Sequence, residues 1–377
     1  MKIALTGGHF TPALAIIEEG LIKHDFFVLG RKHSFEGEKT FSYEYSVCQK
    51  LSIPFFPLRA GRIQRKFTKH TMPSVLRMPL GLYDAYYILK KIRPDVLLTF
   101  GGYLSFPAVL ACKLLKIPIV IHEQTQGVGL ANRQIGKYFA KKICLSFETS
   151  QPFFPKEKTV MTGNPLRKEI FKVEKKLKEL LPDDKLLYVT GGSAGSHFIN
   201  KTVSVILEKL LSEFVVVHQT GDSGEYGDFN SLSQIKESLT STLQKRYIVK
   251  KTIENDEIGW VWSNAKCVMG RAGINTVQEA IASKVPALFI PLPHGQKGEQ
   301  LANARLAQDS GLAVVLLQEN ATAEVVLQKL NEAVEINRNN FTKSKIDKII
   351  SKDAASLVLD IVQSVYEENL SEKNKKS

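Results

Sequence analysis

KLLYVTGGSAG at residues 185–195 and KIALTGGH at residues 2–9 share one design. In each stretch a short apolar run ends in a glycine-containing turn, and a helical pattern follows it. Continuous apolar runs between helices are typical of parallel strands that are buried on both faces. Two such starts in one chain predict an α/β protein with two Rossmann-like, doubly wound parallel sheets.

Further apolar runs extend each predicted sheet. We expect strands at 95–99 and 117–121 in the first half, and at 214–217, 267–269 and 287–290 in the second. We place the domain boundary after residue 163, so that the domains cover residues 1–163 and 164–351. The last helix, at 352–370, is expected to pack back on the first domain, and residues 371–377 to form a disordered tail.

Length and composition narrow the class of protein. The 377 residues suit two domains, and the net charge of +13 favours an anionic partner such as nucleic acid, a membrane surface or a phosphorylated substrate. A solvated basic surface is the plain alternative. The four cysteines form no CxxC pair, which argues against a metal site and for a reducing compartment. We also expect neither a signal peptide nor a transmembrane helix, because no apolar run is long enough.

Glycine-rich turns follow the strands at the sheet edges where doubly wound folds bind ligands. The turns at 6–9 and 191–195 each open a helix, and backbone N–H groups at a helix N-terminus favour an anion. Ser193 can add a hydroxyl to the second turn. His9 is a candidate general base near neutral pH. The alternatives are tight turns that only need glycine, and a structural histidine.

Polar side chains mark three more strand ends. Glu279 stands two turns into the helix that follows Arg271, where a carboxylate can accept hydrogen bonds from ribose hydroxyls. Gln300 and Asn303 lie in a polar helix start whose amides can bind sugar hydroxyls. The stretch 122–124 ends a first-domain strand and also indicates a site. Solvated helix residues and a capped loop are the plain alternatives.

The segment 59–93 carries nine basic residues and one acidic residue, Asp84, with apolar residues interleaved. This pattern predicts a membrane-surface anchor on anionic lipid, and a core helix with a basic rim is the alternative. No nucleic-acid motif accompanies the charge, so we expect no nucleic-acid partner. The predicted membrane contacts are Arg62, Arg65, Lys66, Lys69, Leu76 and Arg77.

Eight stretches of the sequence, taken together and in their order along the chain, resemble glycosyltransferase family 28. They are similar to its bacterial members that act on UDP-N-acetylglucosamine and lipid I. The resemblance runs from the first strand to about Gly311. It implies a GT-B fold, with two Rossmann-like domains facing a cleft, the first binding lipid I and the membrane and the second the nucleotide sugar. The stretches are TGGHFTPALA (6–15), FGGYLSFPAVLA (100–111), IHEQTQGVGLANR (121–133), GNPLR (163–167), GGSAG (191–195), HQTG (218–221), RAGINTVQEA (271–280) and EQLANA (299–304).

The resemblance also implies residue roles. His9 is the implied base, Ser193 lies at the donor phosphates and Glu279 binds ribose. The implied donor-binding residues are Thr6, Gly7, Gly8, Asn132, Arg167, Ser193, Arg271, Glu279, Gln300 and Asn303, of which Thr6 and Asn132 also face the acceptor. The implied acceptor residues, for its diphosphate or saccharide, are Gly101, Gly102, Tyr103, His122, Glu123 and Gln124.

The implied reaction is an inverting transfer of N-acetylglucosamine to lipid I, which forms lipid II in peptidoglycan synthesis. It uses neither a metal nor another cofactor, in keeping with the lack of a DxD motif. The implied location is peripheral, on the cytoplasmic face of the cell membrane, where other cell-wall synthesis proteins are a further class of partner. The chain departs from the family pattern at Ala4-Leu5, which replace two loop glycines, and at Thr125, which replaces an asparagine.

Three alternatives remain open at this point. The chain could transfer the sugar to another lipid acceptor. It could be a UDP-N-acetylglucosamine 2-epimerase, which shares the two-domain fold and the donor, although a soluble epimerase needs no lipid anchor. It could also be a non-catalytic membrane-binding protein that keeps the fold.

Overall fold

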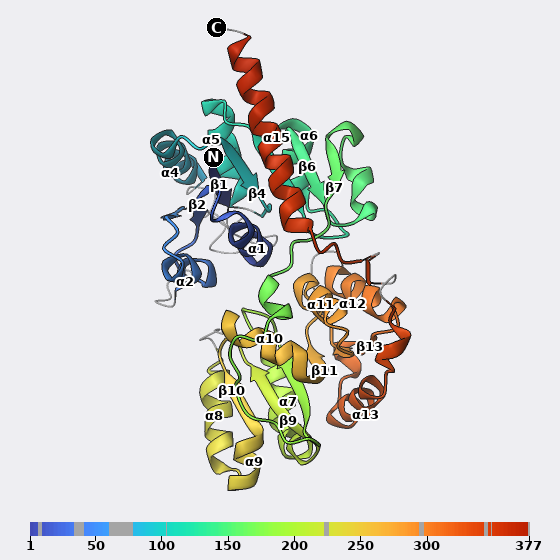
Figure 1. Cartoon of the computed structure of the whole chain (residues 1–377). Helices are drawn as coiled ribbons and strands as arrows, with labels where there is room; N and C mark the ends of the chain where they lie inside the picture. The colour runs from blue at the N-terminus through green and yellow to red at the C-terminus, as the bar shows by residue number, and fades with distance from the viewer. Residues whose placement is uncertain are drawn as a thin grey trace. The chain divides into compact units, whose positions relative to one another are not determined.

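The computed structural model describes residues 1–6, 10–33, 41–59, 78–102, 104–221, 226–293, 298–342, 346–347 and 349–375. Contacts divide the chain into two compact units (Figure 1). The first unit is Met1–Arg167 with Ser351–Ser377, and the second unit is Lys168–Ile350. The border lies a few residues after the predicted one.

The first unit is built on a seven-stranded sheet in the order β3-β2-β1-β4-β5-β6-β7, with all neighbours parallel. Its strands are β1 (Lys2–Thr6), β2 (Asp25–Gly30), β3 (Phe55–Pro57), β4 (Val96–Thr99), β5 (Ile119–Glu123), β6 (Lys142–Leu145) and β7 (Thr159–Met161). Its helices are α1 (Phe10–Gly20), α2 (Tyr43–Lys50), α4 (Met78–Ile92), α5 (Ser105–Leu115), α6 (Leu130–Tyr138) and α15 (Ala354–Asn374), with short 3-10 helices at Glu148–Phe153 and Lys156–Lys158.

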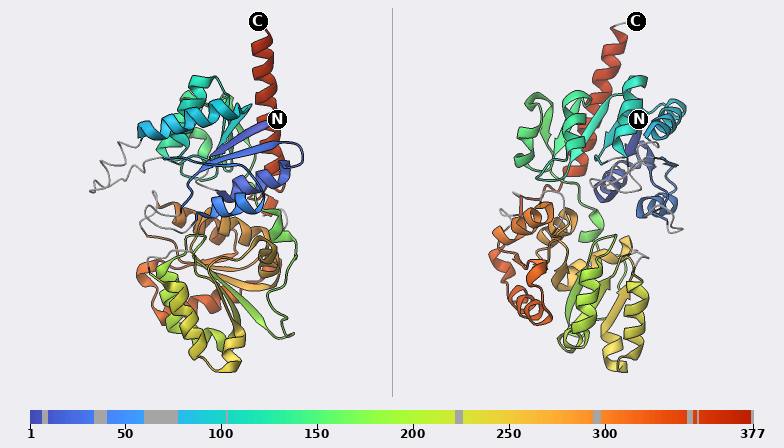
Figure 2. Two further views of the ribbon diagram at one scale, coloured as in Figure 1. Left: turned by 90° about the vertical axis from the view of Figure 1, so that its left-hand side faces the viewer. Right: turned by 180° about the vertical axis from the view of Figure 1, so that it is seen from behind.

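Helices cover both faces of this sheet (Figure 2). Side chains alternate along β1, so Ile3 and Leu5 pack on the face of α1 and α15, whereas Ala4 packs on the face of α4 and α5. Both sets are fully buried, as expected for a parallel strand with helices on each side. Helix α15 packs through Val358 and Val362, and it continues to Asn374, through the start of the segment predicted to be a disordered tail.

The second unit repeats the design with a six-stranded parallel sheet in the order β10-β9-β8-β11-β12-β13. Its strands are β8 (Lys185–Thr190), β9 (Phe214–Gln219), β10 (Tyr247–Lys250), β11 (Ala265–Gly270), β12 (Ala287–Phe289) and β13 (Ala313–Val315). Its helices are α7 (His197–Glu213), α8 (Asp228–Ser238), α9 (Ser241–Arg246), α10 (Asn255–Asn264), α11 (Ile274–Ala282), α12 (Glu299–Asp309) and α13 (Ala323–Val334), with 3-10 helices at Lys168–Phe171, Gln318–Asn320 and Arg338–Asn340.

The predicted fold class is therefore confirmed: the chain is an α/β protein with two doubly wound parallel sheets. Several strand ends differ from the prediction by one or two residues, and one of them concerns the predicted site. Strand β5 runs to Glu123, so His122 and Glu123 lie inside the strand and not after it. Over the described part of the chain, no helix combines the length and the apolar character needed to cross a bilayer.

Candidate functional site

Each sheet has one position where the strand order reverses, between β1 and β4 in the first unit and between β8 and β11 in the second. The connections that follow these two neighbouring strands run in opposite directions along the sheet. In the first unit β1 pairs with β2 on one side and β4 on the other, and in the second unit β8 lies between β9 and β11. Loops that follow such strands diverge and leave a crevice at the carboxyl edge of the sheet. The predicted site residues at or just after the ends of β1, β4, β8 and β11 fall at these two edges, which we call the first edge and the second edge.

Buried hydroxyl groups shape the first edge. Thr6 donates to Thr99 (2.7 Å), Thr99 donates to Ser105 (2.6 Å), and Ser105 donates to the carbonyl oxygen of Gly101 (2.6 Å). All three hydroxyl side chains are fully buried. The predicted ligand contact Thr6 therefore uses its side chain inside the protein, to fix the turn at Gly101.

Gly101 lies directly against Asn132 of α6. Its φ of +80° belongs to the left-handed region, and a Cβ at this position would be 2.0 Å from Oδ1 of Asn132. Glycine is thus required here both by the backbone and by the close approach of the amide. Gly102 has nearly the same φ of +82°, but no described atom lies within 4 Å of its would-be Cβ.

Glu123 is the only carboxylate among the residues predicted at this edge, and it is 2% exposed. Its Oε1 accepts hydrogen bonds from the backbone N–H of Thr125 (2.9 Å) and from the Thr125 hydroxyl (2.6 Å). Its Oε2 accepts a hydrogen bond from Nδ2 of Asn132 (2.7 Å). The structure therefore brings Gly101, Glu123 and Asn132 together at one sheet edge.

The neighbours of Glu123 on the same strand end are also buried. His122 is fully buried, and its Nε2 donates to the carbonyl oxygen of Gly163 (2.9 Å). Gln124 is 3% exposed. Arg167, predicted at the donor, is half-buried and is the last residue before the chain enters the second unit.

Ten predicted residues lie outside the described parts of the chain. They are Gly7, Gly8, His9 and Tyr103 of the predicted site, and Arg62, Arg65, Lys66, Lys69, Leu76 and Arg77 of the predicted membrane contact.

The second edge is built around the turn between β8 and α7. Gly195 touches the next loop so closely that a Cβ would be 2.1 Å from the carbonyl oxygen of Thr220. Nε2 of Gln219 donates a hydrogen bond to the carbonyl oxygen of Gly192 (3.1 Å). Ser193, predicted at the donor phosphates, is exposed at the tip of this turn. The contacts between the turn at 191–195 and the loop after β9 thus fix the position of the Ser193 hydroxyl and of the backbone N–H groups of the turn.

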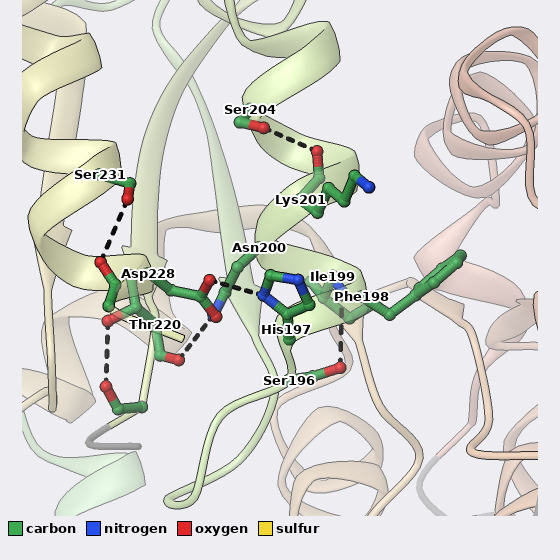
Figure 3. Close-up of polar contacts among 12 residues, drawn as sticks. Ser196, His197, Phe198, Ile199, Asn200, Lys201, Ser204, Thr220, Asp228 and Ser231 are labelled. Carbon is green, nitrogen blue, oxygen red and sulfur yellow. Dashed lines mark hydrogen bonds and ion pairs between the residues drawn. The ribbon is translucent and has the colours of Figure 1, made fainter. Parts of the chain in front are cut away.

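A polar network that is buried at Asn200 and exposed at His197 supports this turn (Figure 3). Nδ2 of Asn200 donates to the carbonyl oxygen of Thr220 (3.0 Å) and to Asp228 (2.7 Å), and Asp228 also accepts from His197 (2.7 Å). These bonds tie the start of α7 to the start of α8 and to the loop after β9.

His218 completes the network, and its tautomer follows from its partners. Because Nδ2 of Asn200 is already donating, Oδ1 must accept from Nε2 of His218 (3.0 Å). Nδ1 of His218 then accepts from the Tyr247 hydroxyl (2.9 Å). Complete burial lowers the pKa of His218 to about 3, so the ring is neutral at pH 7.

Arg271 is the buried cation of the second edge and is 7% exposed. Its guanidinium donates to the Ser196 hydroxyl (2.9 Å), to the carbonyl oxygen of Ile290 (2.9 Å) and to Oε1 of Gln318 (2.6 Å). Burial lowers its pKa to about 10, which leaves it protonated at neutral pH. Arg271 therefore organises the edge through neutral partners and places a positive charge beside the turn that precedes α7.

The remaining predicted donor residues also bind within the protein. Oε2 of Glu279 accepts from the indole N–H of Trp262 (3.1 Å). Gln300 accepts from the backbone N–H of Leu292 (3.0 Å), and Nδ2 of Asn303 donates to the carbonyl oxygen of Ala272 (3.2 Å). Gln300 and Asn303 thus fix the loops that follow β12 and β11. Among the described residues, no cluster of three His, Cys, Asp or Glu side chains could hold a metal ion.

Sequence reasoning missed several residues that shape the two edges. Each of them forms a side-chain hydrogen bond from within an apolar or glycine-rich stretch. They are Thr99, Ser105, Asn200, His218, Gln219, Asp228 and Trp262. The tetrapeptide HQTG was a usable signal for two of them, because its polar His218 and Gln219 end a buried strand. Asn200, Asp228 and Trp262 bind partners that are distant along the chain, so no local pattern reveals them.

Comparisons with known proteins cover most of the chain and agree on one family. The glycosyltransferase family 28 N-terminal domain matches residues 6–144, and the glycosyltransferase family 28 C-terminal domain matches residues 186–358. A Clostridium botulinum (strain Langeland) protein is 32% identical over 359 residues, covering 92% of this chain and 95% of that protein. It is named UDP-N-acetylglucosamine--N-acetylmuramyl-(pentapeptide) pyrophosphoryl-undecaprenol N-acetylglucosamine transferase.

Two solved structures show the same fold. Acinetobacter baumannii MurG has a TM-score of 0.63 at 24% identity, covering 96% of this chain and 99% of that chain. A UDP-GlcNAc 2-epimerase from Neisseria meningitidis, bound to UDP-GlcNAc, has a TM-score of 0.64 at 15% identity, covering 97% and 100%. At these identities the structures speak for the fold alone, whereas the two domain matches and the C. botulinum relative decide the family. The chain belongs to glycosyltransferase family 28 and is a glycosyltransferase.

Proposed function

We propose that this enzyme transfers N-acetylglucosamine from UDP-N-acetylglucosamine to lipid I, the undecaprenyl-diphosphoryl muramoyl peptide, and so forms lipid II for peptidoglycan. The observation that carries the proposal is the Clostridium botulinum relative, which is named as a transferase of this kind and aligns over 92% of this chain at 32% identity. The epimerase alternative draws only on structural likeness at 15% identity.

The second edge suits the nucleotide diphosphate. As the glycosidic bond breaks, UDP leaves with developing negative charge, which fixed dipoles and a nearby cation can stabilise. The turn at 191–195 offers backbone N–H groups at the start of α7 and the exposed hydroxyl of Ser193. Arg271 adds a protonated guanidinium bonded to Ser196 at the end of that turn. We assign the diphosphate to this turn and ribose to Glu279.

We assign the acceptor to the first edge, where the carboxylate of Glu123 holds the amide of Asn132 and the Asn132 oxygen has no donor among the described residues. The attacking sugar hydroxyl has a high pKa and needs a base. His9 remains our candidate for that base. A single in-line displacement inverts the anomeric centre, and it requires no covalent nucleophile and no metal ion.

We further propose that the first unit docks on an anionic membrane surface at the cytoplasmic face of the cell membrane. Within the described part of the basic segment, α4 exposes Leu80, Tyr83 and Tyr87, which are 43%, 64% and 63% exposed. Lys90 and Lys91 lie in the last turn of the same helix. Exposed aromatic and basic side chains together favour an interfacial location.

A turnover assay with purified protein tests the proposal. We expect UDP release and formation of lipid II with detergent-solubilised lipid I, and little UDP release without it. Formation of UDP-N-acetylmannosamine without acceptor would favour the epimerase instead. Efficient transfer to diacylglycerol or a sterol, with none to lipid I, would reassign the acceptor.

A further inference from the structure

The carboxylate of Glu123 is held from both ends by the protein. Thr125 binds Oε1 twice, through its backbone N–H and its hydroxyl, and Asn132 binds Oε2. Thr125 is itself fixed, because Ser150 donates to its carbonyl oxygen (2.6 Å). The carboxylate therefore cannot turn toward a ligand without losing one of these bonds, and its role is to orient a neighbour.

That neighbour is the side-chain amide of Asn132, and its orientation follows from the contact. A carboxylate only accepts hydrogen bonds, so the amide atom 2.7 Å from Oε2 must be Nδ2. Oδ1 then points to the turn at Gly101, where a would-be Cβ lies 2.0 Å away. Within the described part of the chain, nothing donates to this Oδ1, although Asn132 is only 7% exposed.

We propose that Thr125 is a positioning residue which, through Glu123, presents the Asn132 carbonyl oxygen at the Gly101 turn to bind a hydrogen-bond donor of the sugar substrate. This inference rests on the proposed function. Thr125 was not among the residues that the sequence singled out for the site.

The chemistry of this buried, unpartnered oxygen limits which ligand group it can bind. With Nδ2 engaged, the amide offers only an acceptor, so its partner must carry an N–H or O–H group. Sugar hydroxyls and acetamido N–H groups meet this requirement, whereas an ionised diphosphate does not. Both the acceptor and the donor sugar carry such groups, and kinetics can tell which of the two binds Asn132.

The first experiment removes the Thr125 hydroxyl. Thr125→Val deletes one of the two bonds to Oε1, and we expect the KM of one sugar substrate to rise about tenfold because Asn132 is less well oriented. Thr125→Ser keeps the hydroxyl and should restore the KM to within about twofold of the original protein. A rise in the lipid I KM assigns the contact to the acceptor, and a rise in the UDP-N-acetylglucosamine KM assigns it to the donor sugar.

Thr159→Val is the matched control. Thr159 lies in the same unit, and its hydroxyl donates to the carbonyl oxygen of Lys156 (2.8 Å), away from the site. This variant should change neither KM. Melting temperatures of all variants identify any loss of activity that comes from unfolding.

The second experiment reverses the direction of the hydrogen bond between residues 123 and 132, and then restores an acceptor oxygen at the Gly101 turn. In Glu123→Gln, the amide oxygen stays with the N–H of Thr125, so the new Nε2 faces Asn132 and turns its amide round. This presents a donor at Gly101, and we expect the same KM to rise about tenfold or more. Asn132→Asp alone places two carboxylates together and should be at least as poor. In the double variant, Gln donates to Asp and an acceptor oxygen returns, so the KM should recover to within about threefold.

The outcomes separate this inference from the proposed function. Turnover of lipid I by the original protein, with both KM values unchanged in Thr125→Val, would overturn the positioning role. A double variant no better than its worse single variant would overturn it too. Absence of lipid I turnover by the folded original protein would instead contradict the proposed function.

Discussion

The two edges share a topology but differ in the chemistry they bury. At the first edge, the described polar groups include the hydroxyls of Thr6, Thr99 and Ser105 and the pair Glu123–Asn132. At the second edge, the neutral ring of His218 and the guanidinium of Arg271 lie behind the turn that precedes α7. The first edge presents hydrogen-bond acceptors, and the second presents positive charge and N–H groups.

This difference teaches that topology fixes where a ligand binds, and buried side chains decide which ligand it is. A crevice forms at the switch point of any doubly wound sheet. An anion requires positive charge there, and a neutral sugar requires paired donors and acceptors. If this comparison is correct, substitutions at the two edges should affect different substrates, and the predictions below run from the largest expected effect to the smallest.

The strongest test at the first edge compares two adjacent glycines. Gly101→Ala places a Cβ 2.0 Å from the Asn132 amide, so we expect a loss of about 3 kcal/mol in the free energy of unfolding and a large rise in the lipid I KM. Gly102→Ala has nearly the same φ without the collision and should cost about 1 kcal/mol. Urea unfolding and steady-state kinetics measure both. Equal losses in the two variants would show that backbone conformation, and not the fit against Asn132, requires glycine.

The second edge is tested by shortening its cation. Arg271→Lys keeps the charge but cannot reach Ser196, Ile290 and Gln318 together, because an ammonium lacks the guanidinium fork. We expect a loss of about 2 kcal/mol in stability and about tenfold weaker UDP binding by calorimetry, with the lipid I KM unchanged.

Arg338→Lys is the control for that substitution. Arg338 donates to the carbonyl oxygens of Ala265 and Lys266, at the opposite end of β11 from Arg271, and burial lowers its pKa as well. It should lose a similar amount of stability and keep its UDP affinity. Weakened UDP binding in this variant would mean that stability, and not the placement of charge, explains the effect at Arg271.

The next prediction concerns pH. Burial lowers the pKa of His218 to about 3 in the folded protein, against 6.5 as its ordinary value. The unfolded chain therefore binds more protons between these values, and stability falls as the pH drops below about 6.5, by at most about 1.4 kcal/mol per pH unit from this residue. His218→Gln can still donate to Asn200 and accept from Tyr247. Urea unfolding from pH 7 to 4.5 should show a shallower slope in this variant, and identical slopes would exclude His218 as the cause.

Much of this picture followed from the sequence, because it is written in local patterns. Alternation of apolar strands, glycine turns and helices gave two parallel sheets, and the same turns placed Gly101, Ser193 and Arg271 at the strand ends. Whether a predicted side chain faces a ligand or the protein could not be foreseen. Thr6 and Glu123 bind partners 93 and 9 residues away, and such pairings depend on tertiary packing.

The smallest expected effect concerns the exposed aromatic side chains of α4 in the first unit. It tests whether these side chains bind a lipid surface. The double variant Tyr83→Ser/Tyr87→Ser removes two stacked, exposed rings from α4. Partial burial of two rings is worth about 1 kcal/mol, so binding to phosphatidylglycerol vesicles should weaken about fivefold. Tyr138→Ser is the control, because Tyr138 is 59% exposed on α6 of the same unit and should not matter. Equal weakening in both would indicate nonspecific contact of aromatic side chains with lipid, and the difference between the two units would then rest on their edges alone.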